Sequence, residues 1–165
     1  MEVKKRSSTV RVGPGEGRAT RMPGGQLVTR KVSGEQTGGA YSLFEVTVDP
    51  GGESAPHVQH REDECFYVLE GAFEFLIEGV KIKASVGSLI YIPKGNLHAF
   101  KNVETTTGRM LVSQTPGGLH ERFLEEAGQR ALDDAAPPAT EVQPDARRPA
   151  GIGAQYGVEI VSPAS

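Results

Sequence analysis

The sequence predicts an all-β protein whose short strands close into a sandwich or barrel, followed by a short helical segment. From Gln26 onward, runs rich in β-branched and aromatic residues alternate with glycine- or proline-containing turns. The chain has 21 glycines and 11 prolines but no tryptophan, a balance that suits many tight turns between short strands. Strands this short and this evenly spaced favour a sandwich or barrel over an α/β sheet. With 165 residues, we expect one domain with its own hydrophobic core.

Residues 1–25 are expected to form an N-terminal arm outside the barrel. They are polar and glycine-rich, and their basic side chains have no aromatic residues between them. The run Gly13–Gly17 has no apolar strand before it and no apolar helix after it, so it does not predict a phosphate-binding loop. A solvated, loosely attached segment is the simplest interpretation.

Residues 26–115 are expected to form the barrel. Turn sequences such as Asp49-Pro50-Gly51-Gly52 and Pro93-Lys94-Gly95 separate the strands. The predicted strands are Leu27–Val32, Tyr41–Val48, Glu64–Leu69, Phe73–Ile77, Lys81–Ala84, Ser88–Ile92, His98–Val103 and Arg109–Thr115.

Residues 116–165 are expected to form a C-terminal helical extension and tail. Leu119, Phe123, Leu124 and Ala127 recur at helical spacing among charged residues, which predicts an amphipathic helix that ends at Gly128. Residues 131–149 are polar and proline-rich, so they are expected to be a linker. A last helical turn spans 152–156 and is expected to pack back on the barrel.

Composition excludes several classes of function. The formal net charge of −3 gives no electrostatic reason to expect nucleic acid or a membrane surface as a partner. Cys65 is the only cysteine, so an intrachain disulfide is impossible and a cytoplasmic location is expected. No apolar run resembles a signal peptide or approaches the roughly 20 residues that span a bilayer.

The histidines and one carboxylate of the barrel predict a metal site. Side chains alternate faces along a strand, so His57 and Gln59 point one way and His60 the other. Glu64 opens the next strand, and His98 follows the Pro93-Lys94-Gly95 turn. Burying imidazole nitrogens and a carboxylate without partners costs several kcal/mol, about 2–7 for each polar group. One divalent transition metal ion satisfies them together, and Fe, Mn, Ni, Cu and Zn are all compatible with these ligands.

The two motifs that carry these residues resemble those of the cupin family. The first cupin motif is matched by Gly51, His57, Glu64 and Gly71. The second motif is matched at every spacing by Gly87, Pro93, Gly95, His98 and Asn102.

This resemblance covers about residues 26–115. It implies a double-stranded β-helix, that is, a jelly-roll barrel. It also implies metal-ligand roles for His57, Glu64 and His98. The Glu62–Gly71 segment, the exit after Thr115 and the closing helix look like the single-domain cupins described as quercetin-dioxygenase-like.

One position departs from the cupin pattern. Where the family places its second histidine, this sequence has Gln59, with His60 one residue later. The amide oxygen of Gln59 can bind a metal, although it is a weaker donor than imidazole for late transition metals. Alternatively, a bulge at the strand end turns His60 inward, or the site has no functional metal.

Other polar residues of the region are expected to have structural roles. Glu62 and Asp63 are interpreted as solvated turn charges, and Cys65 as a packing residue that faces away from Glu64. His120 is interpreted as a surface or cap residue at the start of the predicted helix. Phe66 and Phe100 are core residues that are also placed to line a pocket.

The resemblance implies a function more weakly than a fold, because one fold hosts many reactions. The first hypothesis is a metal-dependent dioxygenase acting on a small aromatic or enol-type compound, with Glu64 as ligand and proton acceptor. The second is a metal-dependent isomerase or cyclase, and the third a non-catalytic small-molecule-binding protein. Small cupins commonly pair their barrels, so a homodimer is expected, with Val10, Val12 and Met22 of the arm available to add a strand to a neighbour.

Overall fold

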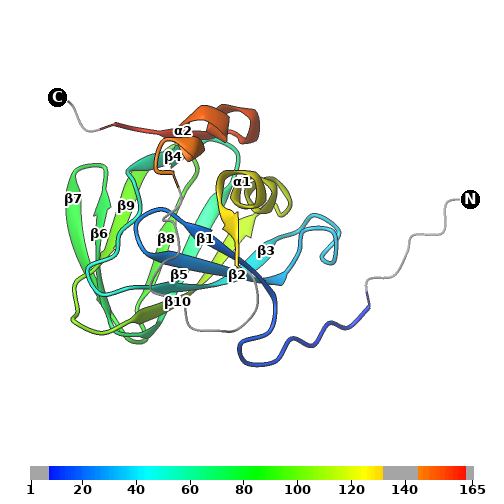
Figure 1. The fold of residues 1–165 in the computed structure, drawn as a ribbon, viewed down its shortest axis with the longest axis horizontal. Coiled ribbons are helices and arrows are strands. Elements are labelled where there is room, and N and C mark those ends of the chain that lie inside the picture. Colours follow the sequence, from blue (N-terminus) through cyan, green and yellow to red (C-terminus); the bar gives the residue numbers. More distant parts are fainter. Residues whose placement is uncertain (1–7, 132–144, 163–165) are drawn as a thin grey trace, which may run out of the picture.

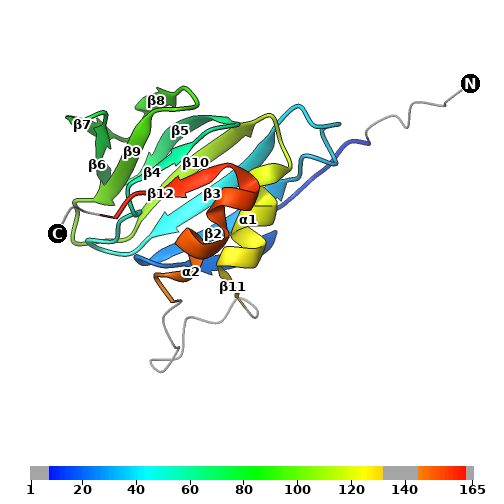
Figure 2. The ribbon, with the colours of Figure 1, turned by 90° about the horizontal axis from the view of Figure 1, so that it is seen from above.

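Two antiparallel sheets enclose the core of the protein, as Figures 1 and 2 show. The structure is a computed structural model and describes residues 8–131 and 145–162. The larger sheet contains, in order across it, β11 (Gln129–Arg130), β1 (Arg18–Met22), β2 (Gln26–Val32), β3 (Ser42–Val48), β10 (Gly108–Thr115), β5 (Asp63–Glu70) and β8 (Leu89–Ile92). The smaller sheet contains β12 (Val158–Ile160), β4 (His57–Gln59), β9 (Leu97–Asn102), β6 (Ala72–Ile77) and β7 (Val80–Ser85).

Alternating apolar residues turn one face of each sheet into the core. In β3, Phe44, Val46 and Val48 are buried, and the residues between them are partly exposed. The smaller sheet contributes Phe73 and Phe75 from β6, both with no exposed surface. The ring of Phe66 packs edge-on against that of Phe75, with centroids 5.2 Å apart, so side chains from the two sheets interlock.

The C-terminal extension packs against the barrel. Helix α1 (Leu119–Ala127) buries Phe123, Leu124 and Ala127, the stripe that the sequence predicts. Helix α2 (Arg148–Gly153) lies beside α1 and continues into the 3₁₀ turn η1 (Ala154–Tyr156) (Figure 1). The chain reverses at Gly157, which has the positive φ of 73° that glycine tolerates, and then enters β12. Strand β12 pairs with β4, so the end of the described chain supports the strand that carries His57.

The predicted fold class is confirmed, as is each strand predicted between Leu27 and Thr115. The prediction of a loosely attached arm is wrong for Arg18–Met22, which forms β1 between β11 and β2. Thr20 and Met22 of β1 face the core, but one is polar, so the alternation was weak in the sequence. Residues 1–7 of the arm lie outside the described residues.

The predicted proline-rich linker, residues 131–149, is described only in part. Most of the predicted linker, 132–144, lies outside the described residues. The prediction is wrong at the C-terminal end of this linker, because Pro149 lies in the first turn of α2, where proline is well tolerated.

Met22 is buried in β1, which pairs with β2 of the same barrel, so it is not available to add a strand to a neighbour. The homodimer and the cytoplasmic location stay predictions, and no helix in the described part is long and apolar enough to cross a membrane.

Replacing Phe75 tests the interlocked core. We expect Phe75→Ala to lower the free energy of unfolding by about 3–5 kcal/mol, because a fully buried ring leaves a cavity. Leu76→Ala is the matched control on the same strand, because Leu76 is 39% exposed. Its cost should stay below about 1 kcal/mol. Urea unfolding measures both, and equal losses would contradict the assignment of the two faces of β6.

Candidate metal centre

Two neighbouring strands of the smaller sheet bring two histidines together. Strands β4 and β9 are antiparallel, and His57 lies directly opposite His98. Residues in this relation project from the same face of a sheet. Their imidazole centroids are 4.3 Å apart. His98 is almost completely buried, whereas His57 keeps a small exposed surface.

The larger sheet contributes a carboxylate to the same point. Glu64 lies on β5 and is buried, and its Oε2 is 2.5 Å from Nε2 of His98 and 3.8 Å from Nε2 of His57. One ligand atom from each of the three residues lies within 4.8 Å of the others. The Glu64 Oε2 and His98 Nε2 atoms do not meet the geometry of a hydrogen bond despite their short separation. They therefore converge on a common region without forming an aligned donor and acceptor pair.

Backbone carbonyls fix the orientation of both imidazoles. Nδ1 of His57 is 2.8 Å from the carbonyl oxygen of Ala55, and Nδ1 of His98 is 3.0 Å from that of Asn96. A carbonyl oxygen only accepts, so each Nδ1 carries the hydrogen and donates it. Each neutral imidazole then presents the lone pair of Nε2 to the centre, as metal-ligating histidines do when their other nitrogen is held in this way.

The charges of the three groups are strongly coupled. Burial alone would raise the pKa of Glu64, but its contact with His98 and the charges of both histidines bring that pKa down to about 2. Burial opposes the charged form of His98, but the contact with Glu64 outweighs it and raises the pKa of His98. Burial and the charge of His98 lower the pKa of His57. A metal ion binds the neutral form of each imidazole, so metal binding at these residues competes with protonation.

These residues fit a divalent transition metal. Two imidazole nitrogens and a carboxylate oxygen suit Zn, Fe, Mn, Ni and Cu alike. The buried Oε2 of Glu64 and Nε2 of His98 have no hydrogen-bond partner, and an ion would satisfy both. His57, Glu64 and His98 would hold it, with further positions open to ligands.

The fourth predicted ligand, Gln59, is buried on the same strand as His57. Only 1% of its surface is exposed, and both atoms of its side-chain amide lack hydrogen-bond partners. An unpaired buried amide costs free energy, so it needs an ion or a polar ligand. The alternative ligand, His60, is exposed, and its Nε2 is 2.8 Å from Oε2 of Glu159 on the outer surface. Gln59, rather than His60, is therefore the residue available to complete the centre.

Three polar residues near the centre escaped the sequence predictions. Gln114 of β10 lies opposite Glu64, and its Nε2 donates a hydrogen bond of 2.5 Å to Oε1 of that carboxylate. Glu62 was predicted to be a solvated turn charge, but it is 1% exposed. Burial and the charge of Glu64 raise the pKa of Glu62 to about 7. Neither Glu62 oxygen has a hydrogen-bond partner in the described part of the chain, although the backbone amide of His120 faces it.

His120 was predicted to be a surface or cap residue, and the structure places it in the wall of a cavity. Burial lowers the pKa of His120 to about 4, so its imidazole is neutral at pH 7. The signal was present in the sequence, because His120 precedes Phe123 and Leu124 by three and four positions and so lies on the apolar stripe of the helix.

Strand alternation carries a similar signal for the other two residues. Glu62 has the parity of Glu64, and Gln114 has the parity of Met110 and Val112, which face the core.

Cys65, the only cysteine, is partly buried. Burial raises the pKa of its thiol, which is the opposite of what a nucleophilic thiol requires.

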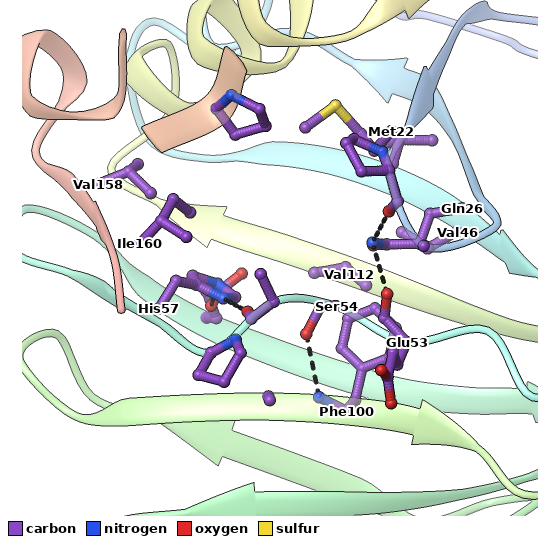
Figure 3. A pocket seen from close by; sticks show the side chains of 18 of the residues that line it. Met22, Gln26, Val46, Glu53, Ser54, His57, Phe100, Val112, Val158 and Ile160 are labelled. Atoms are coloured by element: carbon purple, nitrogen blue, oxygen red, sulfur yellow. Dashed lines mark hydrogen bonds and ion pairs between the residues drawn. The ribbon is translucent and has the colours of Figure 1, made fainter. Parts of the chain in front are cut away.

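A cavity of about 650 Å³ opens beside the centre. Figure 3 shows His57 and Ile160 on one side of it and Met22 and Gln26 on the other. Its polar wall includes His57, Glu64, Gln114 and His120, and the cavity continues around the 53–56 segment towards the outer face of β6 and β9. Its inner wall is mainly apolar and consists of Met22, Val28, Phe44, Val46, Phe66, Val112, Phe123 and Leu124.

Comparison with known families agrees with this geometry. Residues 44–113 match the family model described as the cupin domain. The barrel is therefore similar to the cupin domain over these residues. The match includes His57, Glu64 and His98 but ends before α1 and therefore before His120.

The individual proteins to which this chain is similar match only part of it. An uncharacterized protein of Methanocaldococcus jannaschii is 29% identical over 80 residues, which are 48% of this chain and 64% of that protein. The chain thus spans less than two thirds of the length of this curated relative. KdgF from Halomonas sp. superposes with a TM-score of 0.59 at 22% identity, over 67% of this chain and 96% of that one. An oxalate oxidase in complex with glycolate superposes with a TM-score of 0.51 at 28% identity, over 58% of this chain and 55% of that one.

Removing single histidines tests the metal centre. We expect His57→Ala and His98→Ala each to weaken binding of Zn²⁺ or Mn²⁺ by more than roughly 100-fold, because each removes a nitrogen ligand. His60→Ala is the matched control, because this exposed histidine bonds Glu159. Calorimetric titration of the metal-stripped protein measures the affinities. A loss of affinity in His60→Ala alone would show that the ligand lies on the other face of β4.

The role of Gln59 is tested by supplying the nitrogen that the family pattern places there. We expect Gln59→His to raise affinity for late divalent metals by about 10-fold, which is about 1.4 kcal/mol, because imidazole is the stronger donor. Metal titration of wild type and variant, with the free energy of unfolding measured alongside, separates ligand strength from damage to the barrel. An unchanged affinity in a stably folded variant would mean that residue 59 does not reach the ion.

Proposed function

We propose that this protein is a metal-dependent dioxygenase acting on a small aromatic or enol-type compound. The observation that carries the proposal is the set of two histidines and one carboxylate whose ligand atoms converge beside an apolar cavity. Two histidines and a carboxylate with open positions are the ligand set of many non-heme oxygenases. When bound, the metal would supply Lewis-acid and redox chemistry at this point.

The cavity supports a substrate with an apolar body. Its inner wall is formed mainly by aliphatic and aromatic side chains, which favour the burial of an aromatic ring. Among the described residues, the lysines that line it are Lys81 and Lys101, and both are paired with glutamates, at 2.9 Å from Glu74 and 3.6 Å from Glu53. No arginine of the described ranges 8–131 and 145–162 lines it. A phosphate group would find no unpaired cation there, so a phosphorylated substrate is disfavoured.

The surroundings of Glu64 favour a ligand role over a proton-transfer role. Its Oε1 accepts from Gln114, and its Oε2 faces His98 and His57. An isomerase or cyclase needs a free proton acceptor beside its substrate. Oε1 of Glu64 is held by Gln114 and Oε2 lies against His98, so Glu64 is better placed as a metal ligand than as that proton acceptor. The similarity to an oxalate oxidase adds support from a protein that shares the barrel.

Dioxygen uptake tests the proposal. The protein is stripped of metal, reloaded separately with Fe²⁺, Mn²⁺, Ni²⁺, Cu²⁺ or Zn²⁺, and mixed with a panel of flavonols, catechols and β-diketones. We expect dioxygen uptake with at least one redox-active metal and its loss in Glu64→Ala, because that variant lacks the carboxylate ligand. Glu53→Ala is the matched control, because this carboxylate lies at the outer part of the cavity and pairs with Lys101.

The alternatives give different results in the same assay. Product formed without dioxygen would indicate an isomerase or cyclase. Ligand binding with no product under any condition would indicate a binding protein. Either result would contradict the dioxygenase proposal.

A further inference from the structure

His120 reaches the cavity from outside the barrel. It lies in the first turn of α1, and its imidazole packs between the rings of Phe44 and Phe123, with centroids 6.3 Å and 5.5 Å away. These contacts fix the ring against the wall that also contains His57 and Glu64. The start of α1 has no side-chain cap, and the buried Glu62 carboxylate faces the backbone amide of His120 there. Because Glu62 directly precedes β5, the start of α1 lies close to the strand that carries Glu64.

The two ring nitrogens of His120 make no hydrogen bonds within the described part of the protein. Nδ1 is buried without a hydrogen-bond partner, and Nε2 makes no side-chain hydrogen bond among the described residues. Leaving a buried imidazole nitrogen without a partner is unfavourable. Because the ring is neutral at pH 7, one nitrogen donates and the other accepts. His120 can therefore bind either a hydroxyl or a carbonyl group of a ligand.

The distribution of polar groups limits what such a ligand looks like. The apolar part of the wall comes from strands of both sheets and from the C-terminal helices, whereas His57, Glu64, Gln114 and His120 supply polar atoms to the same cavity. Gln114 already donates to Glu64, so His120 is the polar side chain of this set with no hydrogen bond of its own. A ligand that satisfies both the metal centre and His120 needs an apolar body and two oxygens, one for each.

We propose that His120 is a ligand-binding residue that hydrogen-bonds the second oxygen of a catechol- or enediol-type ligand, while the first oxygen faces His57, Glu64 and His98. This inference rests on the proposed function, because it assumes that the metal centre takes the first oxygen. It goes beyond the cupin domain, since His120 lies outside the matched residues 44–113. His120 selects for two adjacent oxygens over one, and so acts as a specificity determinant.

A comparison of two probes isolates this contact. Catechol and phenol differ by one hydroxyl, and their binding to the Zn²⁺-loaded protein is measured by calorimetry, where a redox-inert metal prevents turnover. We expect the wild type to bind catechol more tightly than phenol. His120→Phe keeps an aromatic ring between Phe44 and Phe123 but removes both nitrogens. It should weaken catechol binding by about 10-fold and change phenol binding less than about 2-fold.

Control variants separate the contact from packing. His120→Gln retains hydrogen-bonding atoms and should keep part of the preference for catechol. His60→Phe replaces an exposed histidine and should change neither affinity. Equal weakening of catechol and phenol by His120→Phe would assign His120 a packing role and overturn the inference. Unchanged catechol binding, or no binding of either probe by the wild type, would also overturn it.

The metal dependence of the same titrations distinguishes the two proposals. If catechol binds equally well to wild type and to His57→Ala, the metal centre does not hold the first oxygen and the proposed function fails. If His57→Ala weakens both probes while His120→Phe weakens neither, the metal centre stands and the role of His120 fails. A catechol preference that depends on His120 in a protein without dioxygen uptake would retain the binding role and reject the dioxygenase.

Discussion

The burial of the Glu64 carboxylate between two histidines is the constraint on which the rest of the site depends. A charged group at 4% exposure inside an apolar barrel is tolerated only where it is paired. The partners come from different elements, with His57 and His98 on the smaller sheet and Gln114 beside Glu64 on the larger one. The carboxylate therefore links the two sheets at the point where the cavity opens. A metal ion at this point would join the same three residues, His57, Glu64 and His98, through coordinate bonds.

The C-terminal extension completes a site that the barrel motifs begin. Strand β12 pairs with β4 along the residues that include His57 and Gln59, which ties the ligand-bearing strand to the end of the chain. Helix α1 adds a neutral imidazole and an apolar face to the same cavity. The barrel thus supplies the candidate metal centre, and the extension supplies part of the wall of the cavity beside it. Differences in such extensions are one physical route by which a common barrel takes different substrates.

Local alternation predicted the strands of the barrel and the inward position of His57 and Glu64, because both follow from the parity of short strands. It failed at β1, where only Met22 of the two buried side chains is apolar. Glu62 and Gln114 were missed because polar residues were assigned to the surface by type, although their parity with Glu64 and Val112 pointed inward. His120 lay on the predicted apolar stripe, but only the packing of α1 against the barrel, a contact between distant segments, brings it to the cavity. The pairing of β12 with β4 is equally non-local, and no short-range pattern contains it.

The central claim is that His57, Glu64 and His98 converge on one metal ion, and anomalous diffraction tests it most directly. Crystals of the metal-stripped protein are soaked in Mn²⁺ or Zn²⁺, and data are collected on both sides of the absorption edge of the metal. The account predicts a single strong anomalous peak within about 2.0–2.3 Å of Nε2 of His57, Nε2 of His98 and a carboxylate oxygen of Glu64. The absence of a peak between these atoms at saturating metal, or a peak bound by His60 on the outer surface, would contradict it.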